Sequence, residues 1–376
     1  MISLIPRLSA YRPDMYGLSK SCSTMIVGIH LLPDWSLARR YFSCVVKDQK
    51  ARRCRLLDRE WDSFVANASY PSIFQTSLWG EVVRSIGQQP YRVEIRDSNG
   101  RLIAGALLIR RRTTSLLSML SLNRGLVSWG PVASDEEGLR AVLRLIIEES
   151  LHHRISEVLI TNDAFDPSAF AMSGFENVNA ELDHEILIDL ERPLEDLWRG
   201  LDKDCRSAVR KAERDGVEVI EGSSGEFYEL YLATRERLEV KATPKSFFEK
   251  IESALGSDLC TFLLAKLRGQ VIGGMLMLRY GGIGWYYEGA SDADFWIHRA
   301  NNLLQWKAIE LGKRRGLRIY NLTQVPSPSD KRNRHYGLYL FKSQFGGALR
   351  RLRTFRYARR RYTSAGRFIY SLAGWS

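Results

Sequence analysis

A single lysine stands among large apolar side chains near the C-terminal end of the chain, in the stretch GLYLFKSQFGG (337–347). Lys342 directly follows Phe341, and a Gly-Gly pair comes shortly after it. A fixed cation can stabilise negative charge that develops in a transition state. A lysine in an extended segment can also lay its stem along apolar side chains and keep its ammonium in water. Composition alone favours this second interpretation.

Two further groups of residues could contact a substrate. Arg206 and Arg210 are four positions apart in a predicted helix, so they share one face. Such a pair could bind phosphate, although a solvated basic face is the more common role. Tyr286 and Tyr287 lie in a predicted strand, in which neighbouring side chains point to opposite faces. One of them therefore belongs to the core, and the other could line a cleft and offer its hydroxyl to a substrate.

Familiar catalytic and metal-binding motifs are absent from the sequence. It contains no G-x-x-x-x-G-K-[ST], G-x-S-x-G or H-E-x-x-H. The five cysteines form no C-x-x-C pair, which argues against a disulfide framework or a zinc site and favours a reducing compartment. The apolar run 25–33 is too short to span a bilayer. These features predict a cytoplasmic protein without a bound cofactor, and they leave peripheral contact with the inner face of the membrane open.

The elements that must position the candidate residues alternate between helix and strand. Hairpin, helix and strand patterns follow one another at 91–163, and the same order returns at 261–322. Two α/β domains of similar build explain this rhythm, and 376 residues suffice for two cores. The predicted parts are an N-terminal extension, a first domain, a second domain and a basic, aromatic C-terminal tail, at 1–53, 54–185, 186–349 and 350–376.

The positive charge is concentrated at the C-terminal end. The chain has a net charge of +12, no Asp or Glu follows Asp330, and residues 331–376 hold twelve of the 55 Lys and Arg. Such a field attracts an anionic partner. Seven arginines fall within 350–361, interleaved with Phe355 and Tyr357. We expect the segment 350–367 to lie on tRNA phosphates or on anionic lipid headgroups.

Several longer stretches resemble the Fem-type aminoacyltransferases, FemA, FemB and FemX, and the related transferases built from two GNAT-like domains. The similar stretches keep the family's order along the chain and together cover roughly residues 55–350. They lie at 72–87, 197–219, 227–251, 265–291, 301–322 and 337–347. The resemblance implies two GNAT-like α/β domains in tandem, each with a mixed, twisted sheet flanked by helices.

The resemblance also implies an enzyme that forms an amide bond. In the Fem branch, an amino acid passes from aminoacyl-tRNA to an amine on the stem peptide of a peptidoglycan precursor. In related branches the donor is an acyl-CoA, and the acceptor is an amine of an exopolysaccharide or an amino sugar. A third alternative is a basic RNA- or membrane-binding protein on an inactive transferase scaffold. Aminoacyl-tRNA and a lipid-linked or nucleotide-linked envelope precursor are the expected partners of the first.

The family's Phe-Lys pair before Gly-Gly corresponds to Phe341 and Lys342, and this correspondence gives the lysine a catalytic role. The amine that attacks the ester creates a tetrahedral oxyanion, which a fixed cation stabilises only in the transition state. The aromatic neighbours would lower the local dielectric. Gly346 and Gly347 would let the backbone approach a ligand closely.

The remaining family positions imply substrate contacts. Gln75 and Trp79 fall on the family's N-terminal substrate motif, where they would help to form the acceptor cleft. Arg84 stands near the position of a phosphate-binding lysine in the family. Arg237 matches an arginine that can bind the acceptor's phosphate, for which a bidentate guanidinium is suited. Arg206, Tyr286 and Tyr287, which follow from the helix spacing and strand alternation above, complete the predicted substrate-binding residues.

Two departures from related sequences bear on the mechanism and the donor. A carboxylate often found after the family's R-G-P-V segment is replaced by Ser134, with Asp135 one residue further on, so the general base is left open. An acetyl-CoA enzyme normally shows [QR]-x-x-G-x-[GA] at the start of a helix, where backbone N–H groups hold the pyrophosphate. The corresponding segment, 298–306, has no glycine. This absence favours aminoacyl-tRNA as the donor.

Overall fold

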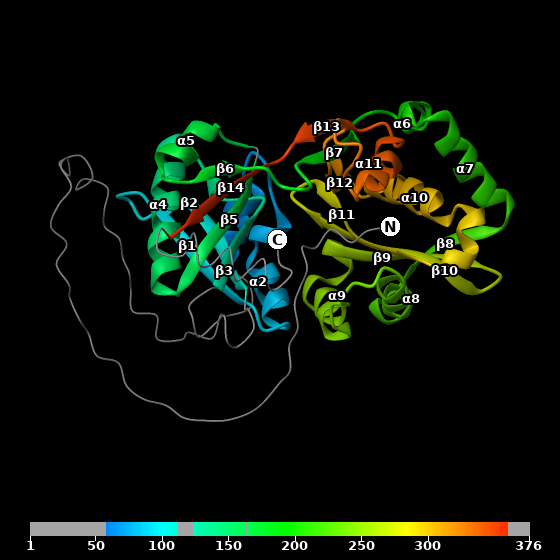
Figure 1. Ribbon diagram of the computed structural model, residues 1–376, viewed down its shortest axis with the longest axis horizontal. Helices are drawn as coiled ribbons and strands as arrows, with labels where there is room; N and C mark the ends of the chain where they lie inside the picture. The colour runs from blue at the N-terminus through cyan, green and yellow to red at the C-terminus, as the bar shows by residue number, and fades with distance from the viewer. Residues whose placement is uncertain (1–57, 112–122, 163, 360–376) are drawn as a thin grey trace, which may run out of the picture.

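The computed structural model describes residues 58–111, 123–162 and 164–359 as two α/β domains that lie side by side (Figure 1). The predicted N-terminal extension lies outside these residues. The α/β fold class predicted from the sequence is confirmed, because each domain is a mixed sheet flanked by helices. Among the described residues, no helix combines the length and hydropathy needed to cross a bilayer.

The first domain is built on a seven-stranded mixed sheet, in the order β1-β2-β3-β5-β14-β6 with β4 paired to β2. Its strands are β1 (Gln89–Arg96), β2 (Leu102–Arg111), β3 (Asn123–Ser128), β4 (Val132–Ala133), β5 (Ile155–Asn162), β6 (Glu176–Val178) and β14 (Arg353–Ala358). Its helices are α1 (Arg59–Ala66), η2 (Ile73–Gln75), α2 (Ser77–Arg84), α4 (Glu136–His152) and α5 (Pro167–Met172). The apolar face of α4 packs on the sheet through residues such as Val142 and Ile146.

The second domain also has a seven-stranded sheet, in the order β13-β7-β12-β11-β10-β9-β8. Its strands are β7 (His184–Asp189), β8 (Val217–Gly222), β9 (Cys260–Leu267), β10 (Gln270–Tyr280), β11 (Ile283–Ser291), β12 (Ile319–Val325) and β13 (Ala348–Arg351). Its helices are α6 (Leu194–Gly200), α7 (Lys203–Arg214), α8 (Ser224–Arg237), α9 (Lys245–Leu259), η3 (Ala293–His298), α10 (Ala300–Arg314) and α11 (Tyr336–Ser343). Helices α8 and α9 cover one face, and α10 and α11 cover the other (Figure 1).

The prediction of a C-terminal tail from residue 350 is wrong for residues 350–358. The chain forms β13 at the edge of the second sheet and then crosses to the first sheet, where β14 pairs with both β5 and β6 (Figure 1). Phe355 is only 1% exposed, and its ring stacks on Phe170 with centroids 3.8 Å apart. Arg356 pairs with Glu176 at 2.8 Å. The arginines from residue 360 onward lie outside the described residues.

The segment around Lys342 is a helix rather than a strand. In α11, Leu338 and Lys342 are four residues apart and occupy the same buried face. The glycines after the helix serve the fold: a side chain at Gly346, where φ is 74°, would collide with the Gly200 carbonyl. A Cβ at Gly347 would lie 2.6 Å from Ile186 Cγ2. The close backbone approach predicted for a ligand is therefore made to the protein itself.

Candidate active site

Lys342 is fully buried at the point where two parallel strands separate. Strands β11 and β12 pair only from Ile283 to Trp285, and each continues beyond that point. The Lys342 ammonium lies in this region, where it donates to Thr323 Oγ1 at 3.2 Å and to the Gln324 carbonyl at 3.1 Å. Its exposed fraction is 0%, which rules out the strand lysine with a solvated ammonium.

The surroundings of Lys342 disfavour its charge. Burial lowers the pKa of the amine well below its usual value, and Glu288, itself buried, opposes this effect electrostatically. The ammonium also lies 5.4 Å from the centre of the Tyr286 ring, whose face attracts a cation. Within the described parts of the chain, no carboxylate forms an ion pair with Lys342. The amine is thus held by neutral groups in a site of low dielectric.

Thr323 holds the lysine from an unusual backbone conformation. Its φ of 62° lies in the left-handed region, which a β-branched residue rarely adopts. The residue sits at an irregularity of β12, where the register with β7 shifts between Asn321 and Gln324. Asn321 Oδ1 accepts from the Thr323 amide at 2.6 Å and stabilises the irregularity. Such strain is found where the surrounding structure fixes a functional group.

The two tyrosines predicted from the strand pattern face opposite sides of the second sheet. Tyr286 lies in the core beneath α10 and α11, next to Lys342. Tyr287 packs with the helices on the other face and contacts Trp79 at 5.5 Å between ring centres. Burial raises the pKa of both phenols, so both hydroxyls stay protonated. Only Tyr286 is brought to the lysine.

A cavity of about 190 Å³ opens beside Phe341, the residue before the buried lysine. Its walls come from the end of β11, from η3 and from the start of α10, and they include Ser291, Trp296, Arg299 and Asn301. Arg237, at the end of α8, is exposed and reaches the same edge: its guanidinium lies over the Trp296 ring at 4.8 Å. The predicted residue Phe341 thus lines this cavity, and Arg237 contacts Trp296 in its wall. Lys342 follows Phe341 in α11 but is not among the lining residues.

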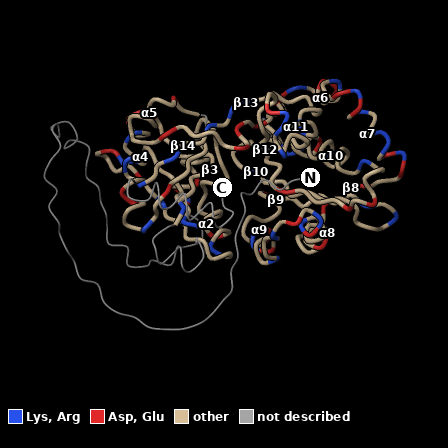
Figure 2. The backbone as a smooth tube through the Cα atoms, viewed as in Figure 1, with Lys and Arg blue, Asp and Glu red and all other residues tan. Residues whose placement is uncertain are grey.

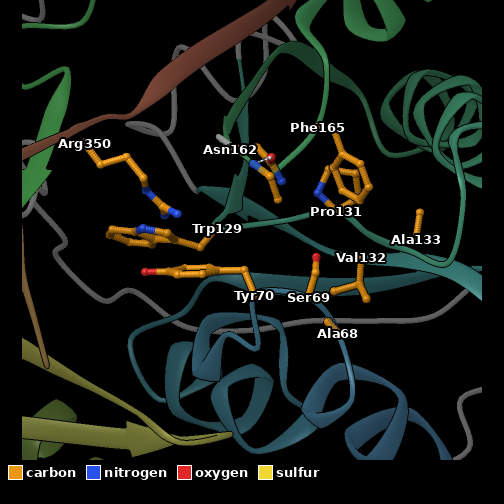
Figure 3. A pocket seen from close by; sticks show the side chains of 11 residues that line it. Ala68, Ser69, Tyr70, Trp129, Pro131, Val132, Ala133, Asn162, Phe165 and Arg350 are labelled. Carbon is orange, nitrogen blue, oxygen red and sulfur yellow. Dashed lines mark hydrogen bonds between the residues drawn. The ribbon is translucent and has the colours of Figure 1, made fainter. Parts of the chain in front are cut away.

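A second, smaller pocket lies between the domains. It holds about 20 Å³, enough for a water molecule, and is lined in part by Tyr70, Trp129 and Arg350. Figure 3 shows the Arg350 guanidinium lying close to the two aromatic rings, and its distance to the Tyr70 ring centre is 4.6 Å. The buried Glu185 accepts from Arg350 Nε at 2.9 Å and from Trp129 Nε1 at 3.1 Å. Asn321 donates to the same carboxylate at 2.7 Å.

The sequence patterns do not predict this interdomain network of Tyr70, Trp129, Glu185, Asn321 and Arg350. Its members come from five distant segments, and Arg350 was assigned to a tail. Asn321 links the network to the active site, because its side chain contacts Glu185 at one end and Thr323 at the other. The spacing of these residues carries no signal, and only the pairing of β7 with both β12 and β13 brings them together.

Gln75 and Trp79, predicted to line an acceptor cleft, are committed to the protein interior. Gln75 Nε2 donates to the Ser128 carbonyl at 2.8 Å, and its Oε1 accepts from the Leu107 amide at 2.8 Å. Trp79 is 5% exposed and makes edge contacts with rings of both domains. Both residues stabilise the first domain and its contact with the second, which leaves neither one a free group for a substrate.

The two remaining predicted arginines lie away from Lys342. Arg84 is exposed at the end of α2 and pairs with Glu81. Arg206 donates to the carbonyls of Arg199 and Leu201 and so satisfies the end of α6. Helix α7 carries both signs of charge along its length (Figure 2), which fits a solvated face better than a phosphate site. In the described parts of the chain, no cluster of His, Cys, Asp and Glu could hold a metal ion.

Sequence comparisons connect the two domains to known families. Residues 56–161 match the model of the FemAB family, and residues 199–330 match that of the acetyltransferase (GNAT) domain. A UDP-N-acetylmuramoylpentapeptide-lysine N(6)-alanyltransferase of Weissella viridescens is 28% identical over 145 residues, which is 37% of this chain and 41% of that protein. A lipid II:glycine glycyltransferase of Staphylococcus epidermidis is 27% identical over 127 residues, 31% of this chain.

The alignments span less than half of these curated relatives, with 41% of the alanyltransferase and 30% of the glycyltransferase covered. Solved structures show the same fold over a larger part of the chain. The structure of FemX superposes with a TM-score of 0.69 at 18% identity, covering 84% of this chain and 98% of FemX. A tandem GNAT protein from the clavulanic acid pathway gives a TM-score of 0.51 at 13% identity, over 80% of this chain and 94% of that protein. The predicted tandem of GNAT-like domains is thereby confirmed.

Proposed function

We propose that this chain, whose first domain matches the FemAB family and whose fold is a tandem of two GNAT-like domains, transfers an amino acid from aminoacyl-tRNA to an amine of a peptidoglycan precursor. The observation that carries the proposal is the fully buried Lys342, whose amine donates to Thr323 and to the Gln324 carbonyl. The acceptor would be the amine of a stem peptide, because the alanyltransferase relative is named for a pentapeptide lysine and the glycyltransferase relative for lipid II. A lipid-linked acceptor would bring the protein to the inner face of the membrane.

Lys342 would act on the oxyanion of the tetrahedral intermediate. An ammonium has three N–H donors, and Thr323 and Gln324 accept two of them. The third has no hydrogen-bond partner among the described residues. The amine of the acceptor attacks the ester carbonyl, its nitrogen loses a proton, and the ester C–O bond breaks to release the ribose hydroxyl. Negative charge on the carbonyl oxygen would raise the proton affinity of Lys342 and hold the ammonium form when it is needed.

Water or a group of the substrate would take the proton from the attacking amine. Asp135, one of the carboxylates considered from the sequence, caps α4 by accepting from the Gly138 amide at 2.7 Å. No cofactor takes part, since amide formation from an activated ester needs none. The chemistry of the step therefore depends on positioning and on charge stabilisation.

An acyl-CoA donor is the second candidate and has less support. Helix α10 begins at Ala300 without the glycines that let a pyrophosphate approach the backbone in acetyl-CoA enzymes. Arg299, just before it, is the left-handed residue of the segment, with a φ of 56°.

Product mass spectrometry tests the donor and the acceptor together. The purified protein is incubated with a lipid-linked precursor and with either a mixed aminoacyl-tRNA pool or acetyl-CoA. We expect an amino-acid mass increment only in the reaction with tRNA. An acetyl increment would transfer the protein to the acyl-CoA branch, and no increment in either reaction would reject a peptidoglycan acceptor.

Substitutions at Thr323 test how the lysine is held. We expect Thr323→Ala to lower kcat about 10- to 150-fold, because a hydrogen bond to a charged group contributes roughly 1.5–3 kcal/mol. Thr323→Ser keeps the hydroxyl and should transfer at nearly the wild-type rate. Thr354→Ala is the matched control, since it truncates another buried threonine, on β14. Equal rates for the alanine and serine variants at position 323 would show that the hydroxyl does not support catalysis.

A further inference from the structure

Glu185 is a buried carboxylate beside the residues that hold Lys342. Its exposed fraction is 0%. On one side it pairs in register with Gln324 of β12, whose carbonyl accepts from the Lys342 ammonium at 3.1 Å. On the other side it pairs with Arg350 of β13, whose Nε donates to the carboxylate at 2.9 Å. Burying a carboxylate contributes little stability even when it is paired, because the lost hydration offsets the attraction. The position of Glu185 next to Gln324 points instead to a role at the lysine.

The carboxylate fixes the orientation of the Asn321 side-chain amide. Glu185 can only accept hydrogen bonds, and it accepts from Asn321 Nδ2 at 2.7 Å. The Tyr70 hydroxyl accepts from the same nitrogen at 2.9 Å. Asn321 Oδ1 therefore faces the Thr323 amide, which donates to it at 2.6 Å. A reversed amide would set its oxygen against the carboxylate and its N–H groups against the Thr323 N–H, so the negative charge selects one of the two orientations.

The irregularity of β12 at Thr323 connects this amide to the lysine. Asn321 and Gln324 pair with residues of β7 that are only two positions apart, so β12 has one extra residue here. Such a bulge redirects side chains and is common beside active sites. Thr323 Oγ1 lies 3.1 Å from the Tyr286 carbonyl, to which it can donate, and it accepts from Lys342 at 3.2 Å. The bond from the Thr323 amide to Asn321 thus holds the bulge that presents the hydroxyl to the ammonium.

The first domain reaches the same carboxylate through Trp129. Its indole Nε1 donates to Glu185 at 3.1 Å, and its φ of 46° lies in the left-handed region. The protein holds Trp129 in this conformation: its amide donates to Thr161 Oγ1 at 3.2 Å, and its ring stacks on Phe74 with centroids 4.8 Å apart. Two non-glycine residues with left-handed backbones, Trp129 and Thr323, therefore stand at the two ends of one hydrogen-bonded network. Strained conformations of this kind cluster at functional sites.

We infer that Glu185 is a positioning residue that aligns Lys342 and makes this alignment depend on contact between the two domains. It acts through Asn321 and Thr323 and does not touch the reacting atoms. The inference rests on the proposed function, because it takes Lys342 as the cation that stabilises the oxyanion. The second domain carries the lysine, and the first domain, through Trp129, helps to keep it in place.

Glu185→Gln tests the inference in steady-state transfer to the lipid-linked precursor. Glutamine has the same shape, but its oxygen is drawn to the charged Arg350 guanidinium, so its NH2 group faces the Asn321 donor. We expect kcat to fall about 10- to 100-fold, the range typical of outer hydrogen-bond partners in metal sites. KM for the precursor should stay within about threefold, because Glu185 does not bind the acceptor.

A double-mutant cycle separates positioning from general damage to the structure. If Glu185 acts through Thr323, Thr323→Ala already releases the ammonium, and adding Glu185→Gln should lower kcat further by less than about threefold. Glu157→Gln is the matched control, because it makes the same exchange at a partly buried carboxylate of the first sheet, which pairs with Arg124 at 2.7 Å. It should keep the wild-type kcat. Independent losses in the cycle, which multiply in kcat, would overturn the inference, and so would a wild-type kcat in Glu185→Gln.

Trp129→Phe tests the contribution of the first domain by a milder change. Phenylalanine keeps a ring against Phe74 and removes the indole N–H, and the pair of Glu185 and Arg350 remains. We expect kcat to fall about three- to tenfold, the usual effect of one lost hydrogen bond. An unchanged kcat would overturn the dependence on domain contact.

A crystal structure of Glu185→Gln gives a readout that does not need turnover. We expect the Thr323 backbone to leave the left-handed region and Thr323 Oγ1 to lie beyond hydrogen-bond distance of Lys342 Nζ. An unchanged Thr323 and an unmoved lysine would overturn the inference. If both move as expected while the wild type transfers no amino acid to the lipid-linked precursor, the positioning role of Glu185 stands and the proposed function fails.

Discussion

Lys342→Met is expected to lower kcat of the transfer at least about 100-fold while the protein stays folded. Removing a single donor from an oxyanion site typically costs a factor of 10² to 10³ in kcat. Methionine has nearly the same length and suits a position with 0% exposure. Single-turnover transfer from aminoacyl-tRNA would measure the chemical step directly. Ser343→Ala, at the next position of α11, should retain transfer within about twofold, and a Lys342→Met variant with the wild-type rate would remove the lysine from the mechanism.

Lys342→Met should also change how the stability of the protein depends on pH. The folded pKa of Lys342 is lowered by burial, whereas the unfolded lysine keeps its usual value of 10.5. Between these two pKa values the unfolded state binds more protons, so wild-type stability rises with pH by up to about 1.4 kcal/mol per unit. Above pH 10.5 the lysine is neutral in both states, so burying it no longer costs the free energy of deprotonation or of a buried charge. Below the folded pKa that cost is fully present. Methionine does not titrate.

As the pH rises from 7 to 10, the Tm of the wild type should therefore increase relative to the Tm of Lys342→Met. Thermal unfolding followed by circular dichroism at several pH values measures this difference, and the titration of other groups cancels between the two proteins. A difference that does not change with pH would mean that the lysine has an ordinary pKa in the folded state.

Phe355→Ala should lower the free energy of unfolding by about 3–5 kcal/mol, the usual loss for a fully buried phenylalanine. The expected loss is large because Phe355 fills the core of the first domain from the far end of the chain, stacked on Phe170. Urea unfolding would place the loss in the transition of the first domain. Arg356→Ala on the same strand removes a partly exposed ion pair with Glu176, so its loss should stay within about 1 kcal/mol. Similar losses in both variants would contradict a core role for Phe355.

Most elements of the fold could be predicted from local patterns. The β9–β10 hairpin has its turn at Arg268 and Gly269, as the sequence predicts, and both residues have positive φ. The alternation of Tyr286 and Tyr287 across β11 also follows from the sequence. The sequence predicts an extended segment at Lys342, where the structure has helix α11. Eleven residues rich in aromatics and glycine suit a strand as well as a helix, and only packing on β12 distinguishes the two.

The candidate site could be predicted in part. Lys342 and Phe341 were found through a family motif, but nothing in the sequence announced Thr323 or Glu185. The role of Thr323 depends on a strand irregularity, and that of Glu185 on the meeting of three strands with the first domain. For Gln75 and Trp79 the family motif predicted substrate contacts, and the structure shows that both side chains pack inside the protein. Their hydrogen bonds and ring contacts lie between elements that are distant in sequence.

The passage of the chain from β13 to β14 sets the order in which the molecule can be completed during synthesis. Strand β6 pairs only with β14 among the described strands, and β5 has β14 as one of its two neighbours. Until Arg353–Ala358 leaves the ribosome, β5 is an open sheet edge and the pocket for Phe355 is empty. Although domains usually fold in order from the N-terminus, the domain made first here cannot close until the domain made second has been translated.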